Sequence, residues 1–596
     1  MIREQGLTVA DVGCAAWYGF PINSDSRNEP TGALYTNVSL DIPPGEKKMN
    51  SWSRRFAALT GTALLILCVS ARAQDDKATA KPATPAVPEK SAEAAPPADS
   101  TTQGSITVGG QQIAYTAVAG TITVGSTDDQ DAQLGPDGKP QPGSQLALNA
   151  PASAKDATPV ARMFYVAYFK KDAKAEDRPI TFFYNGGPGS STVWLHMGSL
   201  GPKHVMTAGD THLPAAPYSM VDNPNSLLDV SDLVFVDAPG TGFGQLLGKD
   251  PQKSFWGVDG DGNAYARFIQ RFISKYGRWN SAKFIFGESY GTTRSAVLVN
   301  LLENKLNIDI NGVILLSQIF NFTTDIDEPT ANPGVDLPYE LALPTFAATA
   351  WYHKKLPNQP AALEPFLKEV EEFAMGPYAH ALALGTDVSD EEKRAMAEKL
   401  HEYTGLPVDY VLKANLRVSG PEFEKTLQDA DDLTTGRLDT RFSGPNLDPL
   451  SQNAEYDPQS SAISSAYVAL FNQYVRRDLK YGDGQTYQPE LDTAEPQWNW
   501  VHGGNSIGIN VSADLAEAMK TNPRLKVLVN GGYYDLATPF FAAQYEDKHL
   551  PIPQSLAKNI SYAWYESGHM VYVRDECVKL LHDNVAAFIK NAESTQ

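Results

Sequence analysis

The chain has 596 residues, a net charge of −21 and a pI of about 4.9, and 42% of its residues are hydrophobic. This length and apolar content suffice for a large core, and an acidic chain without a basic cluster is a poor partner for nucleic acids or anionic membranes. The chain has three cysteines, Cys14, Cys68 and Cys577. Cys68 lies in an apparent leader peptide that would be removed, so no disulfide framework is available.

The leader begins well inside the chain. Met49-Asn-Ser-Trp-Ser-Arg-Arg55 is a basic segment, residues 56–69 are apolar, and Ala71-Arg-Ala73 fits a small-x-small cleavage site. The apolar stretch is too short to span a bilayer comfortably. We therefore expect a signal peptide over 49–73, export to the periplasm or exterior of a bacterial cell, and no integral membrane anchor after cleavage.

Residues 1–48 precede this signal. Gly45-Glu-Lys-Lys48 would be encoded by purine-rich codons that resemble a bacterial ribosome-binding site. We interpret residues 1–48 as an over-extended gene model, with Met49 as the true start. Detection of peptides from 1–48 in the expressed protein by mass spectrometry would contradict this interpretation.

After the leader, residues 74–103 are rich in Ala, Pro, Lys and Glu and hold few large apolar side chains. Such a composition cannot bury a core and predicts a disordered linker. From Ile106 the pattern changes to alternating apolar and polar residues, through 106–116 and again through 120–124. These segments predict hairpin strands that lead a catalytic domain.

The next predicted strand, 180–184, runs directly into Asn185-Gly-Gly-Pro-Gly-Ser-Ser191. Paired glycines leave backbone N–H groups unobstructed, so that they can point at a developing oxyanion. Read alone, the segment is also compatible with an ordinary Gly/Pro turn. We favour the oxyanion interpretation.

Further along, Phe284-Ile-Phe-Gly-Glu-Ser-Tyr-Gly291 carries an apolar run into Gly287-x-Ser289-x-Gly291, and a helix-forming segment follows. In a strand–turn–helix elbow the serine hydroxyl is exposed at the top of a parallel sheet. The glycines are needed because a Cβ at either position would crowd the neighbouring strand and helix. A second match, Gly504-Asn-Ser506-Ile-Gly508, follows no buried strand, and we interpret Ser506 as a loop residue.

Two short apolar strands near the C-terminus end in polar residues. The strand 525–530 leads into Gly531-Gly-Tyr-Tyr-Asp535, and the strand 560–565 leads into Glu566-Ser-Gly-His569. Acid and then histidine after the serine is the chain order of α/β-hydrolase triads. The alternatives are a helix N-cap for Asp535 and a surface loop for His569; their positions at strand ends favour catalysis.

Alternation of strands and helices predicts the fold class: α/β, an α/β-hydrolase fold with a mostly parallel central sheet. Between about 325 and 499 the alternation stops and helical segments dominate, which predicts an inserted helical cap. The catalytic domain then comprises 104–324 and 500–592. The predicted strands are 180–184, 232–237, 283–287, 312–317, 525–530 and 560–565, and the helices include 261–276, 292–304, 363–375, 390–403, 464–474 and 575–590.

Metal or cofactor chemistry has little basis in the sequence. No H-E-x-x-H or C-x-x-C occurs, so we expect neither a metal nor a cofactor. Asp259-Gly-Asp-Gly-Asn263 has a calcium-loop composition but lacks the glutamate that such a loop needs, and it is better explained as a solvated turn.

Together these blocks resemble the serine carboxypeptidase family, bacterial type, within the α/β-hydrolase superfamily. The matching blocks are Asn185-Gly-Gly-Pro-Gly-Ser-Ser, Asn223-Pro-Asn-Ser226, Asp237-Ala-Pro-Gly-Thr-Gly-Phe243, Gly287-Glu-Ser-Tyr-Gly, 337–352, Asp535 after Gly-Tyr-Tyr, and Ser567-Gly-His-Met. The resemblance covers about residues 104–590 and implies removal of C-terminal residues from peptides.

Roles follow from the resemblance residue by residue. It implies that Ser289 attacks the scissile carbonyl, that His569 transfers the proton and that Asp535 orients the imidazole. The N–H groups of Gly187 and Tyr290 would hold the oxyanion.

The resemblance also implies a site for the free C-terminal carboxylate of a peptide, formed by Asn185, the Gly186 amide and Glu288. Glu288 can hydrogen-bond a carboxylate only when it is itself protonated, because two anions in contact repel. Such enzymes therefore favour acid pH.

Two positions depart from the family pattern. Many relatives carry a second glutamate where this chain has Ser199, and the usual cysteine of the oxyanion block is replaced by Ser190. Loss of a like charge lowers the pKa of Glu288 relative to those relatives. We predict a less acidic optimum, or weaker carboxylate recognition.

Two other functions stay open at this point. One is an esterase or acyltransferase on the same scaffold, which would keep Ser289, Asp535 and His569 but change carboxylate recognition. The other is a non-catalytic binding protein, which has no need for an intact triad. Turnover of C-terminally amidated substrates separates the first from a carboxypeptidase, and failure of fluorophosphonate labelling would support the second.

Overall fold

The computed structural model describes residues 98–135, 137–506 and 508–594. The predicted upstream extension, the signal peptide and most of the linker lie outside these ranges. One boundary is corrected: strand β1 begins at Ser100, so the last residues assigned to the linker belong to the first hairpin. Gly109 and Gly110, both with positive φ, turn the chain between β1 and β2.

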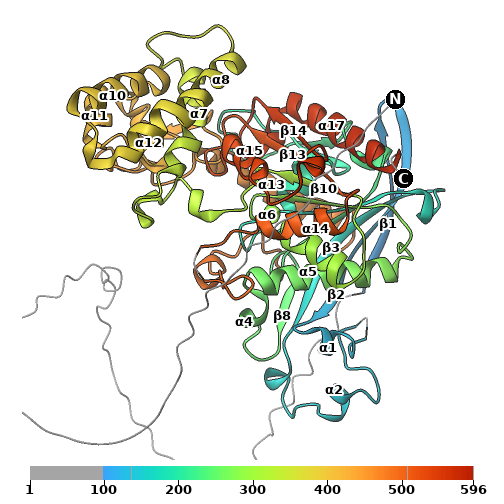
Figure 1. The fold of residues 1–596 in the computed structure, drawn as a ribbon. Coiled ribbons are helices and arrows are strands. Elements are labelled where there is room, and N and C mark those ends of the chain that lie inside the picture. Colours follow the sequence, from blue (N-terminus) through green and yellow to red (C-terminus); the bar gives the residue numbers. More distant parts are fainter. Residues whose placement is uncertain (1–97, 136, 507, 595–596) are drawn as a thin grey trace, which may run out of the picture. The chain divides into compact units, whose positions relative to one another are not determined.

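A sheet of ten strands forms the centre of the molecule, in the order β1-β2-β3-β7-β4-β9-β10-β13-β14, with β8 paired to β3 (Figure 1). Strands β7 through β14 in this order pair in parallel, and the N-terminal strands pair antiparallel. The parallel part confirms the predicted fold class. The strands are β1 Ser100–Val108, β2 Gln111–Gly125, β3 Val160–Lys170, β4 Ile180–Tyr184, β5 Lys203–Val205, β6 Met220–Asp222, β7 Asp232–Val236, β8 Gln245–Leu247, β9 Lys283–Glu288, β10 Gly312–Leu316, β11 Leu433–Thr435, β12 Ser443–Pro445, β13 Lys526–Gly532 and β14 Ile560–Tyr565.

Both faces of the parallel strands are buried, which explains their continuous apolar sequences. Along β9, Phe284 and Phe286 join one core cluster whereas Ile285 joins the other. Helices α5, α6 and α14 supply the cluster of Ile285, and α13 and α17 supply the opposite one. The helices are α1 Asp128–Asp131, α2 Gln145–Leu148, α3 Val193–Gly198, α4 Gln252–Phe255, α5 Val258–Lys275, α6 Tyr290–Asn300, α7 Leu337–Tyr352, α8 Leu363–Phe373, α9 Ala379–Leu384, α10 Asp390–Thr404, α11 Val408–Lys413, α12 Gly420–Thr426, α13 Pro458–Arg477, α14 Ser512–Thr521, α15 Phe540–Lys548, α16 Gln554–Ala557 and α17 Asp575–Ser594.

Within the predicted cap, helices α7 to α12 are grouped together (Figure 1, yellow) and share a third core cluster with residues 533–542. Helix α13 behaves differently. Its apolar residues, such as Tyr467 and Phe471, pack in the same cluster as the central sheet. The segment between 325 and 499 is therefore helical as predicted, but its last long helix packs as part of the α/β body.

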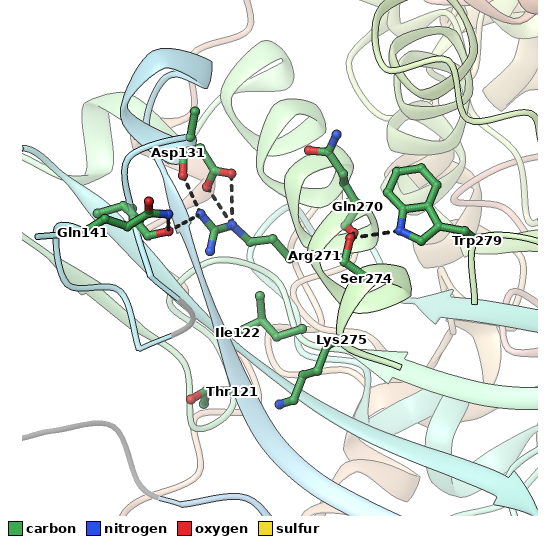
Figure 2. A pocket seen from close by; sticks show the side chains of 11 residues that line it. Thr121, Ile122, Asp131, Gln141, Gln270, Arg271, Ser274, Lys275 and Trp279 are labelled. Carbon is green, nitrogen blue, oxygen red and sulfur yellow. Dashed lines mark hydrogen bonds and ion pairs between the residues drawn. The ribbon is translucent and has the colours of Figure 1, made fainter. Parts of the chain in front are cut away.

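The N-terminal hairpin is fastened to α5 around a cavity of about 600 Å³ (Figure 2). Arg271 of α5 donates from Nε to both carboxylate oxygens of Asp131, at 3.0 and 3.1 Å. On the same helix, Ser274 Oγ accepts from Trp279 Nε1 at 3.1 Å. The Arg271–Asp131 pair thus ties α1 to α5, beside a cavity that β2 also lines.

Across the described ranges, no helix combines the length and apolar character that crossing a membrane requires.

Candidate active site

Ser289 lies in the predicted strand–turn–helix elbow. It follows β9 directly with φ 60° and ψ −132°, and α6 begins at the next residue. A positive φ on a non-glycine residue is strained and is retained where the surroundings enforce it. A Cβ on Gly287 would lie 2.2 Å from the carbonyl oxygen of Gly291, and one on Gly291 would lie 3.0 Å from that of Tyr184. The elbow therefore requires both glycines, one against α6 and one against β4, as predicted.

Asp535 and His569 meet at the ends of neighbouring strands β13 and β14. The Asp535 Oδ2 to His569 Nδ1 distance is 2.8 Å, and Asp535 is fully buried. Burial lowers the pKa of His569, but the adjacent Asp535 carboxylate raises it, and the net shift is above the ordinary value. Asp535 also accepts hydrogen bonds from the amide and hydroxyl of Thr538, at 2.9 and 2.6 Å. The N-cap alternative for Asp535 is wrong, because the next helix, α15, begins at Phe540 with Pro539 as its N-cap.

The loop carrying His569 is held from two sides. Ser317, just after β10, donates from Oγ to the His569 carbonyl at 2.7 Å. From the inserted region, the Leu438 carbonyl accepts from the His569 amide at 2.7 Å, and Asp439 Oδ2 accepts from the Gly568 amide at 3.1 Å. The position of the imidazole therefore depends on the insertion as well as on the sheet.

The oxyanion segment lies against the first turn of α6. A Cβ on Gly186 would lie 2.5 Å from the Tyr290 amide nitrogen, and Gly187 has φ +102°. Tyr290 is the first residue of α6, so its N–H has no acceptor within the helix. The structure thus brings the backbone at 186–187 beside the Tyr290 amide, the two groups that the resemblance assigns to the oxyanion hole.

A buried ion pair positions this segment. Arg294 of α6 donates from Nη1 to the Asn185 carbonyl at 2.7 Å and pairs with Asp261 at 2.5 Å, both side chains being fully buried. Asp261 belongs to the segment interpreted above as a solvated turn, and that interpretation is wrong. Residues 259–263 instead lie in the first turns of α5. The spacing of residues in the sequence does not reveal that Asp261 is buried against a guanidinium partner, Arg294.

Asp237 anchors the other end of the oxyanion segment. Its Oδ1 accepts from the Thr192 amide at 2.7 Å, at the start of α3, and its Oδ2 accepts from the Tyr487 hydroxyl at 3.0 Å. A Cβ on Gly242 would lie 1.8 Å from the Asp237 carboxylate. This contact explains why the Asp237 motif continues with a glycine at 242.

Glu288, at the end of β9, is the buried acid of the site. It is 2% exposed and accepts from the Tyr572 hydroxyl, at 2.8 Å to Oε2 and 3.1 Å to Oε1. Asn185 also hydrogen-bonds it. Burial is the main cause that raises the pKa of Glu288 to about 7. The carboxyl is therefore protonated in mildly acidic solution.

Ser199 does not supply the missing second acid. It is fully buried and donates from Oγ to the Leu195 carbonyl of its own helix at 2.5 Å. Tyr572 contacts Glu288 instead, from a position three residues after His569. Tyr572 was not among the predicted site residues, because a tyrosine in an apolar segment resembles an ordinary core residue.

One cavity, of about 180 Å³, joins six of the eight predicted site residues, and Asp535 and Tyr290 do not line it. Ser289, His569, Glu288, Asn185, Gly186 and Gly187 all line it, together with Ser190, Trp194, Arg437, Leu438, Gln459, Ser460, Ile463, Ser464, Glu490 and Met570.

Ser506, by contrast, is exposed and lies in no regular element. Arg437 was also missed, because it lies in the inserted region, far from every catalytic motif. A serine in a strained elbow, an aspartate-bound histidine and a glycine loop beside the Tyr290 amide are features that serine hydrolases with an α/β-hydrolase fold use.

A family model described as serine carboxypeptidase matches residues 154–576, and the chain belongs to that family. A serine carboxypeptidase-like protein of Oryza sativa subsp. japonica is 31% identical over 131 residues, covering 22% of this chain and 28% of the relative. A serine carboxypeptidase of Caenorhabditis elegans is 27% identical over 173 residues, covering 27% of this chain and 31% of the relative. Less than a third of either relative is thus matched.

Two solved structures align with much of this chain at low identity. A prohormone-processing carboxypeptidase from Saccharomyces cerevisiae aligns with 80% of this chain and 91% of its own, at 12% identity and a TM-score of 0.47. A proline iminopeptidase from Mycobacterium smegmatis aligns with 73% of this chain and 96% of its own, at 12% identity and a TM-score of 0.31.

Proposed function

We propose that this chain is a serine carboxypeptidase that removes C-terminal residues from peptides with a free terminal carboxylate. The observation that carries the proposal is the adjacency of Glu288 and Ser289 on one cavity wall. A nucleophile next to a buried acid that is protonated below about pH 7 places bond cleavage beside carboxylate recognition.

The reaction would proceed through an acyl-enzyme. Ser289 Oγ attacks the scissile carbonyl as His569 takes its proton, and the amides of Gly187 and Tyr290 stabilise the oxyanion. The C–N bond then breaks, and the proton passes from His569 to the leaving amine. Water attacks the acyl group by the same route, with His569 again as base, and releases the shortened peptide.

The protonated Glu288 carboxyl would donate a hydrogen bond to the terminal carboxylate of the substrate, with Asn185 and the Gly186 amide beside it. Above about pH 7 Glu288 ionises and repels that carboxylate. The base, His569, must be neutral, and its raised pKa removes the neutral form in acid. Peptidase activity therefore falls in alkaline solution as Glu288 ionises, and falls in acid as His569 is protonated.

The test is digestion of a peptide and its C-terminally amidated twin by the mature protein, followed by mass spectrometry, with Ser289→Ala as control. We expect stepwise shortening of the free acid only, and its loss in the variant. Equal or faster cleavage of the amide would overturn carboxylate recognition, and absence of cleavage of both would overturn the peptidase.

One observation favours a second function, an esterase or acyltransferase on the same triad. Ser199 turns its hydroxyl to its own helix, so the second acid of many relatives has no substitute at that position. Faster turnover of an ester, or transfer of its acyl group to an added amine or alcohol, would support this function over peptide hydrolysis.

We further propose that the enzyme acts outside the cytoplasm, after cleavage following Ala73. The basic segment from Met49, the apolar stretch 56–69 and the small residues at 71 and 73 support this proposal. N-terminal sequencing of the protein from a periplasmic or culture fraction tests it. A mature protein that begins at Gln74 is expected, and an intact leader on active enzyme would contradict export.

A further inference from the structure

A second, strongly acidic cavity of about 920 Å³ adjoins the catalytic cavity, and Arg437 lines both. The two cavities are also separated by residues that are bonded to each other. Ser460, which lines the catalytic cavity, donates from Oγ to Asp457, which lines the acidic cavity, at 2.7 Å. The charged residues of this acidic cavity are Asp327, Glu328, Glu422, Glu424, Glu455 and Asp457, against Arg417 and Arg437.

The most buried of these carboxylates has an unpartnered oxygen. Glu424 is 3% exposed, and no hydrogen-bond donor meets its Oε1 among the residues that the structure describes. Asp327 Oδ1, in the same cavity, is buried and unpartnered within the same residues. Buried carboxylate oxygens are ordinarily satisfied by donors, so two that are not indicate a place for a donor that the chain itself does not supply.

The two arginines of the cavity are already engaged. Arg417 binds Asp336, at 2.6 Å from Nε and 2.8 Å from Nη2, and Asp336 is not a lining residue. Arg437 binds the other oxygen of Asp327, Oδ2, at 2.6 Å from Nε. This second contact shows that the carboxylates of the cavity are placed to take a guanidinium.

The charge of Glu424 depends on what lies beside it. Burial first, and then the charge of Asp327, raise the pKa of Glu424 to about 8, while Arg437 lowers it and Asp457 raises it. A cation bound beside Glu424 would favour its ionised form and add a charge-assisted hydrogen bond, which is stronger than a neutral one.

We propose that the acidic cavity binds a cationic group of the peptide substrate, an ammonium or guanidinium. This inference rests on the proposed peptidase function, since the shared wall brings residues near the scissile bond within reach of the cavity. The cation has two sources in a peptide: a Lys or Arg side chain, and the α-amino group of a short peptide. In either case the enzyme prefers cationic over neutral peptides of equal size.

The experiment compares kcat/KM for four short peptides that all keep a free C-terminus. An N-acetylated parent carries norleucine at the last two positions, and two variants place lysine at one of these positions each. The fourth is the parent with a free α-amino group. We expect at least a tenfold preference, about 1.4 kcal/mol, for one cationic peptide over the acetylated parent, reduced by added salt.

Glu424→Gln keeps the side-chain volume but cannot ionise beside a bound cation, so it should abolish most of that preference while the parent is still cleaved. Glu328→Gln, at an exposed position of the same cavity, is the second variant and should weaken the preference with no risk to folding. Glu398→Gln, an exposed carboxylate on α10 outside the cavity, is the control and should leave the preference intact.

The outcomes separate this inference from the proposed function. Cleavage of the neutral parent with equal kcat/KM for all four peptides would overturn the acidic cavity as a subsite and leave the peptidase standing. A preference that survives both Glu424→Gln and Glu328→Gln would also overturn it. Failure to cleave the neutral parent and every cationic peptide would overturn the peptidase itself.

Discussion

The catalytic cavity and the acidic cavity share Arg437 but differ in whether the protein supplies hydrogen-bond donors to their buried carboxyl groups. Asp535 receives two hydrogen bonds from Thr538 and contacts His569, and Glu288 receives the Tyr572 hydroxyl. Glu424 has a buried oxygen that no described residue satisfies. The catalytic cavity is thus pre-organised by the protein, whereas the proposed cation site in the acidic cavity would be completed by its ligand.

The largest expected effect tests the catalytic side of the contrast. Ser289→Ala should reduce kcat for peptide hydrolysis by roughly 10⁴-fold or more, because the nucleophile and the acyl-enzyme are lost together. Ser506→Ala changes the serine of the other Gly-x-Ser-x-Gly sequence and is the matched control, expected to retain full activity. Loss of activity in Ser506→Ala, or its retention in Ser289→Ala, would refute the assignment of the elbow.

The next effect concerns the orientation of the imidazole. Asp535→Asn should lower kcat by about 10⁴-fold at neutral pH, since the amide favours the wrong tautomer of His569. The hydrogen bonds from Thr538 should keep the loop folded, so the unfolding midpoint should shift little. Comparable kcat values in the variant and the parent would exclude Asp535 as the partner of the base.

A smaller, pH-dependent effect is expected at Glu288. Its pKa of about 7 lies above the ordinary value, so the protonated form persists to neutral pH and is lost above it. The kcat/KM for a free-acid peptide should therefore fall as the pH rises through about 7, while that for an ester without a carboxylate should not. Glu288→Gln should remove this alkaline fall, and a pH profile identical in parent and variant would count against carboxylate recognition by Glu288.

The last expected effect is a change in stability rather than in rate, on the acidic side of the contrast. Glu424 has a folded-state pKa of about 8, above its ordinary 4.5, so folding favours the protonated carboxyl. Its contribution to stability is fully present below pH 4.5 and is lost as the pH rises to about 8.

Glu424→Gln stays neutral, so the free energy of unfolding of this variant relative to the parent should increase between pH 4.5 and 8, by up to about 5 kcal/mol. Denaturant titrations at the two ends of this range measure it. A difference that is constant with pH would show that Glu424 is not held protonated by its surroundings.

Local sequence patterns predicted the parts of the fold that lie on the sheet. The strands that carry Ser289, Asp535 and His569 appear where their apolar runs predicted them, because buried parallel strands leave a continuous apolar signature. Both glycines of the elbow were predicted as well, because the motif itself shows that a strand and a helix pack closely on either side of the serine.

Pairings between distant segments were not predictable in this way. Asp261 with Arg294, Tyr572 with Glu288, and Arg437 on the cavity wall each join segments whose spacing varies freely in sequence. The packing of α13 on the sheet was missed for the same reason: an amphipathic helix shows that it has a buried face but not which surface covers that face.

The sequence by itself determined the class of the fold, the nucleophile elbow, the order of the candidate triad residues and the family resemblance, because each is encoded within a few consecutive residues. Only the tertiary structure decided that Glu288 is buried enough to stay protonated near neutrality and that an acidic cavity lies beside the catalytic one. The burial of a carboxyl and the charges around it depend on which distant segments come into contact. Those contacts form only when the chain folds, so the sequence pattern does not show them.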